Sequence, residues 1–96
     1  MDAVCFKRDM SISHADFFRT LQSAIGPRPY QTDGNVIQII EQQKKIEIRL
    51  APETQRRIAS LNLPNTMVEF RFEGHGAEEV RHFMENFDRC FQRGGG

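Results

Sequence analysis

The sequence has no net charge, few cysteines and no long apolar run, and each absence excludes a class of protein. Thirteen basic residues balance thirteen acidic ones, so the chain lacks the basic surface that phosphate binding needs. Its two cysteines are too few for a disulfide framework. No apolar stretch approaches the roughly 20 residues of a membrane span, and the first residues carry no secretory leader. We expect a cytoplasmic protein with no nucleic-acid or membrane partner.

Motifs of catalysis and metal binding are also missing. The sequence contains no GxSxG elbow, no glycine-rich phosphate loop and no P-loop lysine. His14, His75 and His82 have no ligand spacing among themselves or with the cysteines. We therefore predict a non-enzymatic protein with no catalytic residue, no metal, no cofactor and no small-molecule ligand.

The 96 residues fit a single domain spanning 1–96. A chain of this size buries only about 60–65% of its unfolded surface, so its core is small. We expect residues 1–11 to form an edge strand or a loose N-terminus, and residues 94–96 to form a flexible tail.

Two segments have the apolar spacing of helices. In 77–93 the apolar residues recur at three, four, seven, ten and eleven positions, which predicts one buried stripe; they are Val80, Phe83, Met84, Phe87, Cys90 and Phe91. The second segment begins at Ser13 as N-cap, with Ile12 placed to pack on Phe17. Gly26 and Pro27 end that helix.

Two segments alternate as strands do. KIEIRL (45–50) and MVEFRFE (67–73) each place apolar residues on one face and charges on the other. The outward charges read plus-minus-plus in the first segment and minus-plus-minus in the second, so matched strands would attract at every opposed pair. This pattern indicates that the two strands are neighbours.

NVIQII (35–40) predicts a third strand, joined to the first by a hairpin. Gln42 and Gln43 lack the glycine that tight turns prefer, so a looser turn or bulge is expected. If Glu41 opposes Lys44, Val36 and Ile40 are left on the charged outer face. An aliphatic patch on the outer face of a sheet is expected to be covered by another part of the assembly, for example a second subunit.

The segment 51–64 has the features of a short helix. Pro52 suits a first helical turn, Thr54, Ile58 and Leu61 share a helical face, and Pro64 would force an extended chain afterwards. We therefore expect a helix between the last two strands.

This element order defines an α+β fold in two layers. We predict an antiparallel sheet of three strands, or four if AVCFK (3–7) also pairs, with the N- and C-terminal helices on one face. The alternative is a ferredoxin-like βαββαβ fold with an additional C-terminal helix. That alternative separates KIEIRL from MVEFRFE, so their charge complementarity favours the first architecture.

The loop 26–35 is the most distinctive irregular stretch. Pro27 and Pro29 stiffen the chain around Arg28, and Tyr30 adds an amphipathic ring; both residue types are common in interaction hot spots. An ordinary connection with a turn at Asp33-Gly34 explains the same residues and is favoured. The candidate interaction residues are Arg28, Tyr30, Val36 and Ile40.

The stretches ISHADFF, RRIASLNLP and FDRCFQRGGG together resemble a family of small uncharacterised bacterial proteins. The resemblance spans most of the chain. It implies a bacterial cytoplasmic protein and brings no activity or ligand.

Three functions follow, in order of preference. The first is a protein-interaction or adaptor domain that binds a protein partner or associates with itself as a homodimer. The second is a ubiquitin-like or sulfur-carrier role for the terminal glycines, although Gly94 falls where a helix C-cap belongs. Nucleic-acid binding is third, because the chain is neutral.

Overall fold

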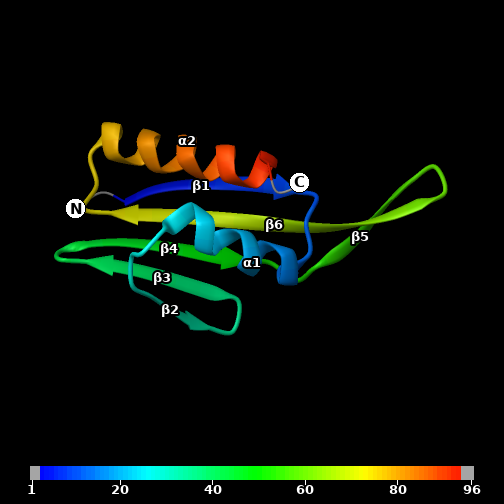
Figure 1. The fold of residues 1–96 in the computed structure, drawn as a ribbon, viewed down its shortest axis with the longest axis horizontal. Coiled ribbons are helices and arrows are strands. Elements are labelled where there is room, and N and C mark those ends of the chain that lie inside the picture. Colours follow the sequence, from blue (N-terminus) through cyan, green and yellow to red (C-terminus); the bar gives the residue numbers. More distant parts are fainter. Residues whose placement is uncertain (1–2, 94–96) are drawn as a thin grey trace.

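The computed structural model describes residues 3–93, and within them it shows one antiparallel sheet of six strands and two helices. Figure 1 shows the elements in chain order: β1 (Ala3–Met10), α1 (His14–Ile25), β2 (Tyr30–Asp33), β3 (Val36–Glu41), β4 (Lys44–Leu50), β5 (Thr54–Ile58), β6 (Leu61–Glu73) and α2 (Ala77–Arg93). The fold is α+β, as the sequence predicts. The expectation of three or four strands is too low, because β2 and β5 were missed.

The strands lie in the order β1-β6-β4-β3-β2, and β5 pairs with the first part of β6. The AVCFK segment is therefore part of an eight-residue strand at the edge of the sheet. Its partner β6 comes more than fifty residues later in the chain, a pairing that no local pattern announces.

The predicted pairing of the two charged strands is confirmed. The matched register brings Lys45 opposite Glu73, Glu47 opposite Arg71, and Arg49 opposite Glu69. Because β4 and β6 are neighbours and β1 lies outside β6, the ferredoxin-like alternative is wrong.

Both predicted helices form where their signals place them. The Ser13 hydroxyl accepts a hydrogen bond from the backbone N–H of Asp16 at 3.1 Å, which caps the start of α1. Gly26 ends α1 with φ 66°, a value that glycine adopts without strain, and its N–H donates to the Gln22 carbonyl.

Helices α1 and α2 pack on one face of the sheet and against each other (Figure 1). The core between the layers is aromatic. Phe87 of α2 lies 4.9 Å, centroid to centroid, from Phe70 of β6 and 6.0 Å from Phe17 of α1. Phe72 and Phe91 are also buried, so the predicted core phenylalanines are confirmed. Cys90 is half-buried against this core.

The helix expected in 51–64 is wrong. Residues 54–58 form β5, which turns at Ala59-Ser60 and pairs with the start of β6. Every residue of β5 is exposed, so the segment shows no two-residue alternation that would have revealed a strand. Pro64 is tolerated because this part of β6 pairs on one side only, with β5.

Two turns also differ from expectation. Glu41 opposes Lys44, so Gln42-Gln43 is a tight two-residue turn and the looser turn is wrong. Gln42 supplies the positive φ of 56° without a glycine. The stretch after α1 is more than a connection, because Tyr30–Asp33 form strand β2 and the turn lies at Gly34-Asn35.

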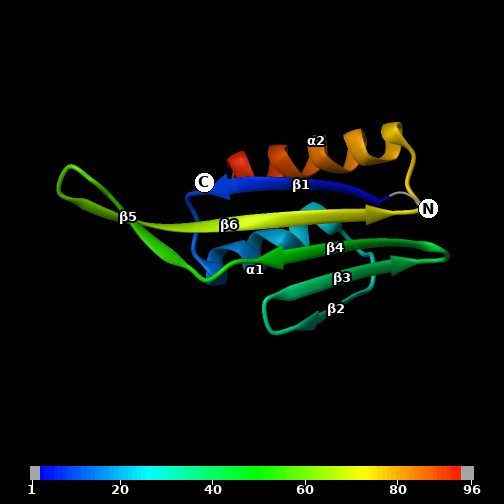
Figure 2. The same ribbon diagram turned by 180° about the vertical axis from the view of Figure 1, so that it is seen from behind.

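The face of the sheet opposite the helices is charged. Figure 2 shows this outer face of β6, β4 and β3, which no described element covers. Val36 and Ile40 lie on it, in register with Arg49 and Lys45, as predicted. Ile40 is 49% exposed, whereas Val36 is half-buried.

Candidate functional site

The hairpin of residues 54–65, called the arm below, projects beyond the helices at one end of the molecule (Figure 1). Its tip carries two large aliphatic side chains directly opposite each other, Ile58 and Leu61. They are 52% and 61% exposed, the highest values among the exposed large apolar residues. The turn between them places Ala59 at φ 55°, a conformation that residues other than glycine rarely adopt. The tip thus presents apolar surface to solvent.

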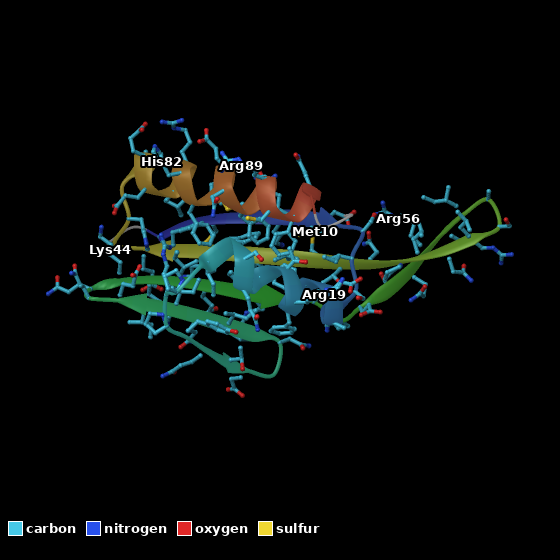
Figure 3. All side chains as sticks on the ribbon, in the orientation of Figure 1. Met10, Arg19, Lys44, Arg56, His82 and Arg89 are labelled. Atoms are coloured by element: carbon cyan, nitrogen blue, oxygen red, sulfur yellow. The ribbon has the colours of Figure 1, made fainter. Side chains whose placement is uncertain are left out.

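Polar contacts hold the base of the arm to the body. The Asp9 carboxylate at the end of β1 accepts one hydrogen bond from Asn65 at 2.6 Å and one from Arg56 at 2.8 Å. These two bonds, Asn65 first, hold the pKa of Asp9 below its ordinary value of 3.8. Figure 3 shows Arg56 where the arm leaves the sheet. The arm therefore has a defined direction.

The arm is also basic. Arg56 and Arg57 are the charged residues of 54–65, and the segment contains no acidic residue. Arg56 is partly neutralised by Asp9 at the base. The apolar tip is consequently accompanied by positive charge.

A second feature, called the end groove below, lies between the start of α2, the β3–β4 turn and the loop after α1. It has a volume of about 900 Å³ and includes Ala24, Ile46 and Phe83 among its apolar lining. The Arg28 guanidinium lies over the Phe83 ring, 5.9 Å from its centroid, and Arg28 Nε is 3.7 Å from Glu41. Cation–π contact and ion pair together hold Arg28 against the body.

The charged groups of the end groove are largely satisfied within the chain. Lys44 forms an ion pair with Glu79, and the backbone N–H of Gly76 donates to the same carboxylate. The pKa of Glu79 is lowered by the hydrogen bond from Lys44 and then by that from Gly76. Figure 3 shows Lys44 and His82 at this end of the molecule. The groove thus combines an apolar lining with His75, whose buried Nδ1 has no hydrogen-bond partner among the described residues.

A third feature, called the edge groove below, follows the open side of β1 beneath α2. It consists of two adjoining hollows of about 420 and 340 Å³ that share Arg8 and Asp88. These two side chains form an ion pair, 3.2 Å between Nη2 and Oδ2. The apolar lining of the first hollow includes Val4, Phe6, Val80 and Met84, and that of the second includes Met10, Ile12, Phe87 and Phe91.

The four predicted interaction residues do not form one patch. Tyr30 pairs with Ile39 and so faces the helix side, where it is 37% exposed. Val36 and Ile40 are on the opposite face. Arg28 and Ile40 both border the end groove. Their role in binding remains a prediction.

Among residues 3–93, no three His, Cys, Asp or Glu side chains lie together as metal ligands. His14 has a structural contact instead, because its Nε2 lies 2.8 Å from the Ala51 carbonyl. Its backbone N–H donates to Glu53, so the residue ties the start of α1 to the chain between β4 and β5. Gly94–Gly96 lie outside the described residues, and both the flexible tail and the carrier role remain predictions.

The arm and the edge groove were both missed in the sequence. Ala59-Ser60 is not one of the dipeptides that mark a hairpin, and β5 lacks alternation. The edge groove depends on where β1 pairs, and only the tertiary structure places β1 outside β6.

Comparison with protein-family models, curated proteins and solved structures finds no match for this chain. None of the helices within 3–93 is both long enough and apolar enough to cross a bilayer. The function therefore has to be inferred from the residues and geometry of the chain itself.

Proposed function

We propose that this protein is a non-enzymatic protein-interaction domain that engages its partner through the arm. The exposed pair Ile58 and Leu61 carries this proposal. Each square ångström of apolar surface removed from water contributes about 25 cal/mol, so a partner that covers the tip gains binding energy there. Exposed apolar surface on a projecting element is typical of interaction sites.

The fixed base of the arm supports the same function. Because Asp9 holds Arg56 and Asn65, the hairpin is ordered before it meets a partner. A preorganised element loses less conformational entropy on binding than a loose loop.

The charge of the arm indicates the chemistry of the partner. Arg57, next to Ile58, has no described ion pair, whereas Arg56 is held by Asp9. A protein with an apolar pocket and an acidic rim fits this arrangement, because it would cover the tip and attract Arg57.

The test compares the natural chain with the double variant Ile58→Ser and Leu61→Ser in quantitative affinity capture from the native host. Both side chains are exposed, so the variant should keep its melting temperature while it loses the specific partner at least tenfold. Met67→Ser is the matched control, because Met67 is 41% exposed on the outer sheet face, away from the tip.

The captured partner should then bind purified protein in a titration, with the same loss for the double variant and none for the control. An identical set of bound proteins for all three chains would refute a role for the arm. If the protein instead binds nucleic acid, and Arg57→Ser abolishes that binding, the arm would serve nucleic-acid binding, the third predicted function.

A further inference from the structure

Within residues 3–93, strand β1 has no neighbouring strand on its outer side. It is the first strand in the sheet order, and its pairing with β6 runs without interruption from Ala3 opposite Glu73 to Met10 opposite Thr66. In an antiparallel pair, every second residue directs its N–H and C=O away from the neighbour. Since β1 has no proline and no bulge, a row of backbone donors and acceptors along it is available to another strand.

Beside the open edge of β1, the edge groove also provides an apolar surface for the side chains of an added strand. Helix α2 packs against both β1 and β6, as the Arg8–Asp88 ion pair and the Phe70–Phe87 contact show. Val4 is 38% exposed there, and Phe6 and Met10 are half-buried. An added strand would thus pair with β1 and pack its side chains beneath α2, as in other strand-addition sites.

We propose that a second copy of this chain occupies the edge groove. Its β1 would run antiparallel to the first β1, about a twofold axis that passes midway between the Phe6 residues of the two copies. The two sheets would then join into one, with all four helices on the same face. This inference concerns a surface other than the arm and does not depend on the arm's function.

The charges of β1 exclude the registers centred on Lys7 and Arg8, and among the registers that oppose no like charges the one centred on Phe6 pairs the most described residues, 3–9 of each copy. When a twofold axis perpendicular to the sheet relates the two β1 strands, each residue pairs with a residue of the second copy whose side chain lies on the same face of the sheet. Centred on Phe6, Val4 opposes Arg8 of the second copy and Cys5 opposes Lys7 of the second copy, and no like charges meet. The next register along the strand opposes Lys7 to itself, and the one after it opposes Arg8 to itself. Like charges directly opposite each other destabilise a sheet.

The helices also fit. Neighbouring strands lie about 4.8 Å apart, and we take α2, which contacts Arg8 of β1 and Phe70 of β6, to lie over the space between these two strands. A β1–β1 pair would therefore place the two α2 helices about two strand spacings apart, or about 10 Å. Packed helices are separated by about 8–10 Å, so neither a gap nor a clash results.

Charge complementarity along α2 identifies the occupant as a second copy. Phe6 precedes Arg8 by two residues, about 6.6 Å of strand, and Arg8 contacts Asp88. At about 1.5 Å per helical residue, the axis passes near Met84. Arg81 lies three residues before Met84 and Asp88 four residues after it. The axis therefore brings Arg81 opposite Asp88 of the second copy, twice.

The remaining charge of the edge groove is already neutralised. Glu85 lies near the axis in both copies, and its carboxylate accepts a hydrogen bond from Arg81 of its own helix at 3.1 Å. Arg8, Arg81, Glu85 and Asp88 together carry no net charge, and Asp9, which also lines the groove, is paired with Arg56. A surface that binds a second copy of itself needs such a balance, because the charges of one copy meet the same set of charges on the other.

A charge-reversal experiment tests the pairing with the full chain. Sedimentation equilibrium should show a dimer for the natural protein. In the Arg81→Glu variant, the new carboxylate at position 81 of each copy would face Asp88 of the other, so two pairs of carboxylates would repel. In the Asp88→Arg variant, the new guanidinium group at position 88 of each copy would face Arg81 of the other, so two pairs of guanidinium groups would repel. Each variant should therefore weaken the dimer by at least about tenfold. A mixture of the two variants restores both attractive pairs and should form the mixed dimer.

Arg89→Glu is the matched control on the same helix. Arg89 does not border the edge groove, and Figure 3 shows it on α2 away from β1, so this variant should remain dimeric. Melting temperatures of all the variants, measured at low concentration, separate loss of folding from loss of pairing.

A cross-link tests the register. Directly opposed β-carbons lie about 4.5–5.5 Å apart, close to the separation in a disulfide. The variant Lys7→Cys should therefore oxidise to a covalent dimer linked between Cys5 and position 7 of the second copy. Lys45→Cys, on the outer face of β4 away from the edge, should give no such product.

Three results would overturn the proposal. They are a natural chain that stays monomeric at millimolar concentration, a dimer that neither charge reversal weakens, and a mixture of the two variants that gains no mixed dimer. In the first case an extended segment of another protein is the remaining occupant of the edge groove. None of these results bears on the arm, whose variants are tested separately.

Discussion

At the residue scale, the aromatic side chains decide the stability of this small domain. Phe87 is 1% exposed, and its ring lies within aromatic contact of Phe17, Phe70, Phe83 and Phe91. Both helices and strand β6 therefore meet at this one side chain.

Replacement of Phe87 by alanine should lower the free energy of unfolding by about 3–5 kcal/mol, because it removes a buried ring and leaves a cavity. Chemical denaturation of the purified variant measures this loss. Phe18→Ala is the matched control, since Phe18 is half-buried and has one aromatic neighbour, Phe17. Equal losses for the two variants would contradict the central position of Phe87.

Gly74 joins β6 to α2 at a point where a side chain has no room. Its φ is 84°, and a β-carbon there would lie 3.0 Å from the Gln43 carbonyl oxygen. The turn between β3 and β4 therefore approaches the start of α2 closely.

The variant Gly74→Ala should be destabilised by more than Gly34→Ala. Gly34 also has a positive φ, 62°, but open space around it, so it reports the conformational cost alone, about 1–2 kcal/mol. Thermal unfolding of the two variants gives the difference, which is the cost of the steric clash. If Gly74→Ala proved the milder change, the close approach of the two turns would be wrong.

At the element scale, the arm depends on its base. It is anchored by Asp9, whose pKa is lowered by Asn65 and Arg56. A carboxylate with a lowered pKa stabilises the folded state above its ordinary value of 3.8, and this contribution is lost as the pH falls through the lower folded value.

Asp9→Ala should therefore increase amide hydrogen exchange in residues 54–65 at neutral pH, while exchange in β4 stays unchanged. In the natural protein, arm protection relative to β4 should fall only when the pH drops below about 3.8, where the natural chain and the variant converge. Glu69→Ala, which removes an exposed partner of Lys7 on the same sheet, is the control. If neither Asp9→Ala nor the drop in pH reduces the protection of the arm from exchange, Asp9 does not anchor it.

At the scale of the whole molecule, one core joins both helices to three strands of the sheet. Buried residues from α1, α2, β3, β4 and β6 form a single cluster. A domain with one core and no internal boundary unfolds as a unit.

Unfolding should accordingly be a single transition, although Tyr30 lies on the edge strand β2. Far-ultraviolet circular dichroism follows the helices and the fluorescence of Tyr30 follows β2; in urea the two curves should coincide. An earlier fluorescence transition would mean that β2 and β3 open before the body.

How much could be predicted differs between the elements. Both helices were predicted to within one residue, because an N-cap at Ser13, a glycine at position 26 and a continuous apolar stripe in 77–93 are local signals. The pairing of β4 with β6 followed from opposed charges. The strand β5 was predicted as a helix because its residues are all exposed and its pairing with β6 has no local signature.

The candidate sites were the least predictable part of the molecule. Arg28 and Tyr30 were selected for residue type, and Val36 and Ile40 for their expected place on the outer face of the sheet, where the fold puts them. Tyr30 lies on the opposite face, so the four do not meet. The arm and the edge groove consist of residues with ordinary local patterns, and they become sites only through their positions.

The sequence by itself determined the α+β class, the two helices, the aromatic core and the charged outer face, because each depends on periodicity within a short segment. The tertiary structure alone decided that residues 54–65 project as an arm and that β1 ends the sheet beside α2. Both depend on β6, which pairs with β5 at one end and with β1 along the other. The β1–β6 pairing joins segments more than fifty residues apart, so the free energy that selects it comes from the assembled sheet and core. The β5–β6 hairpin is local, but its exposed residues carry no strand periodicity that would reveal it.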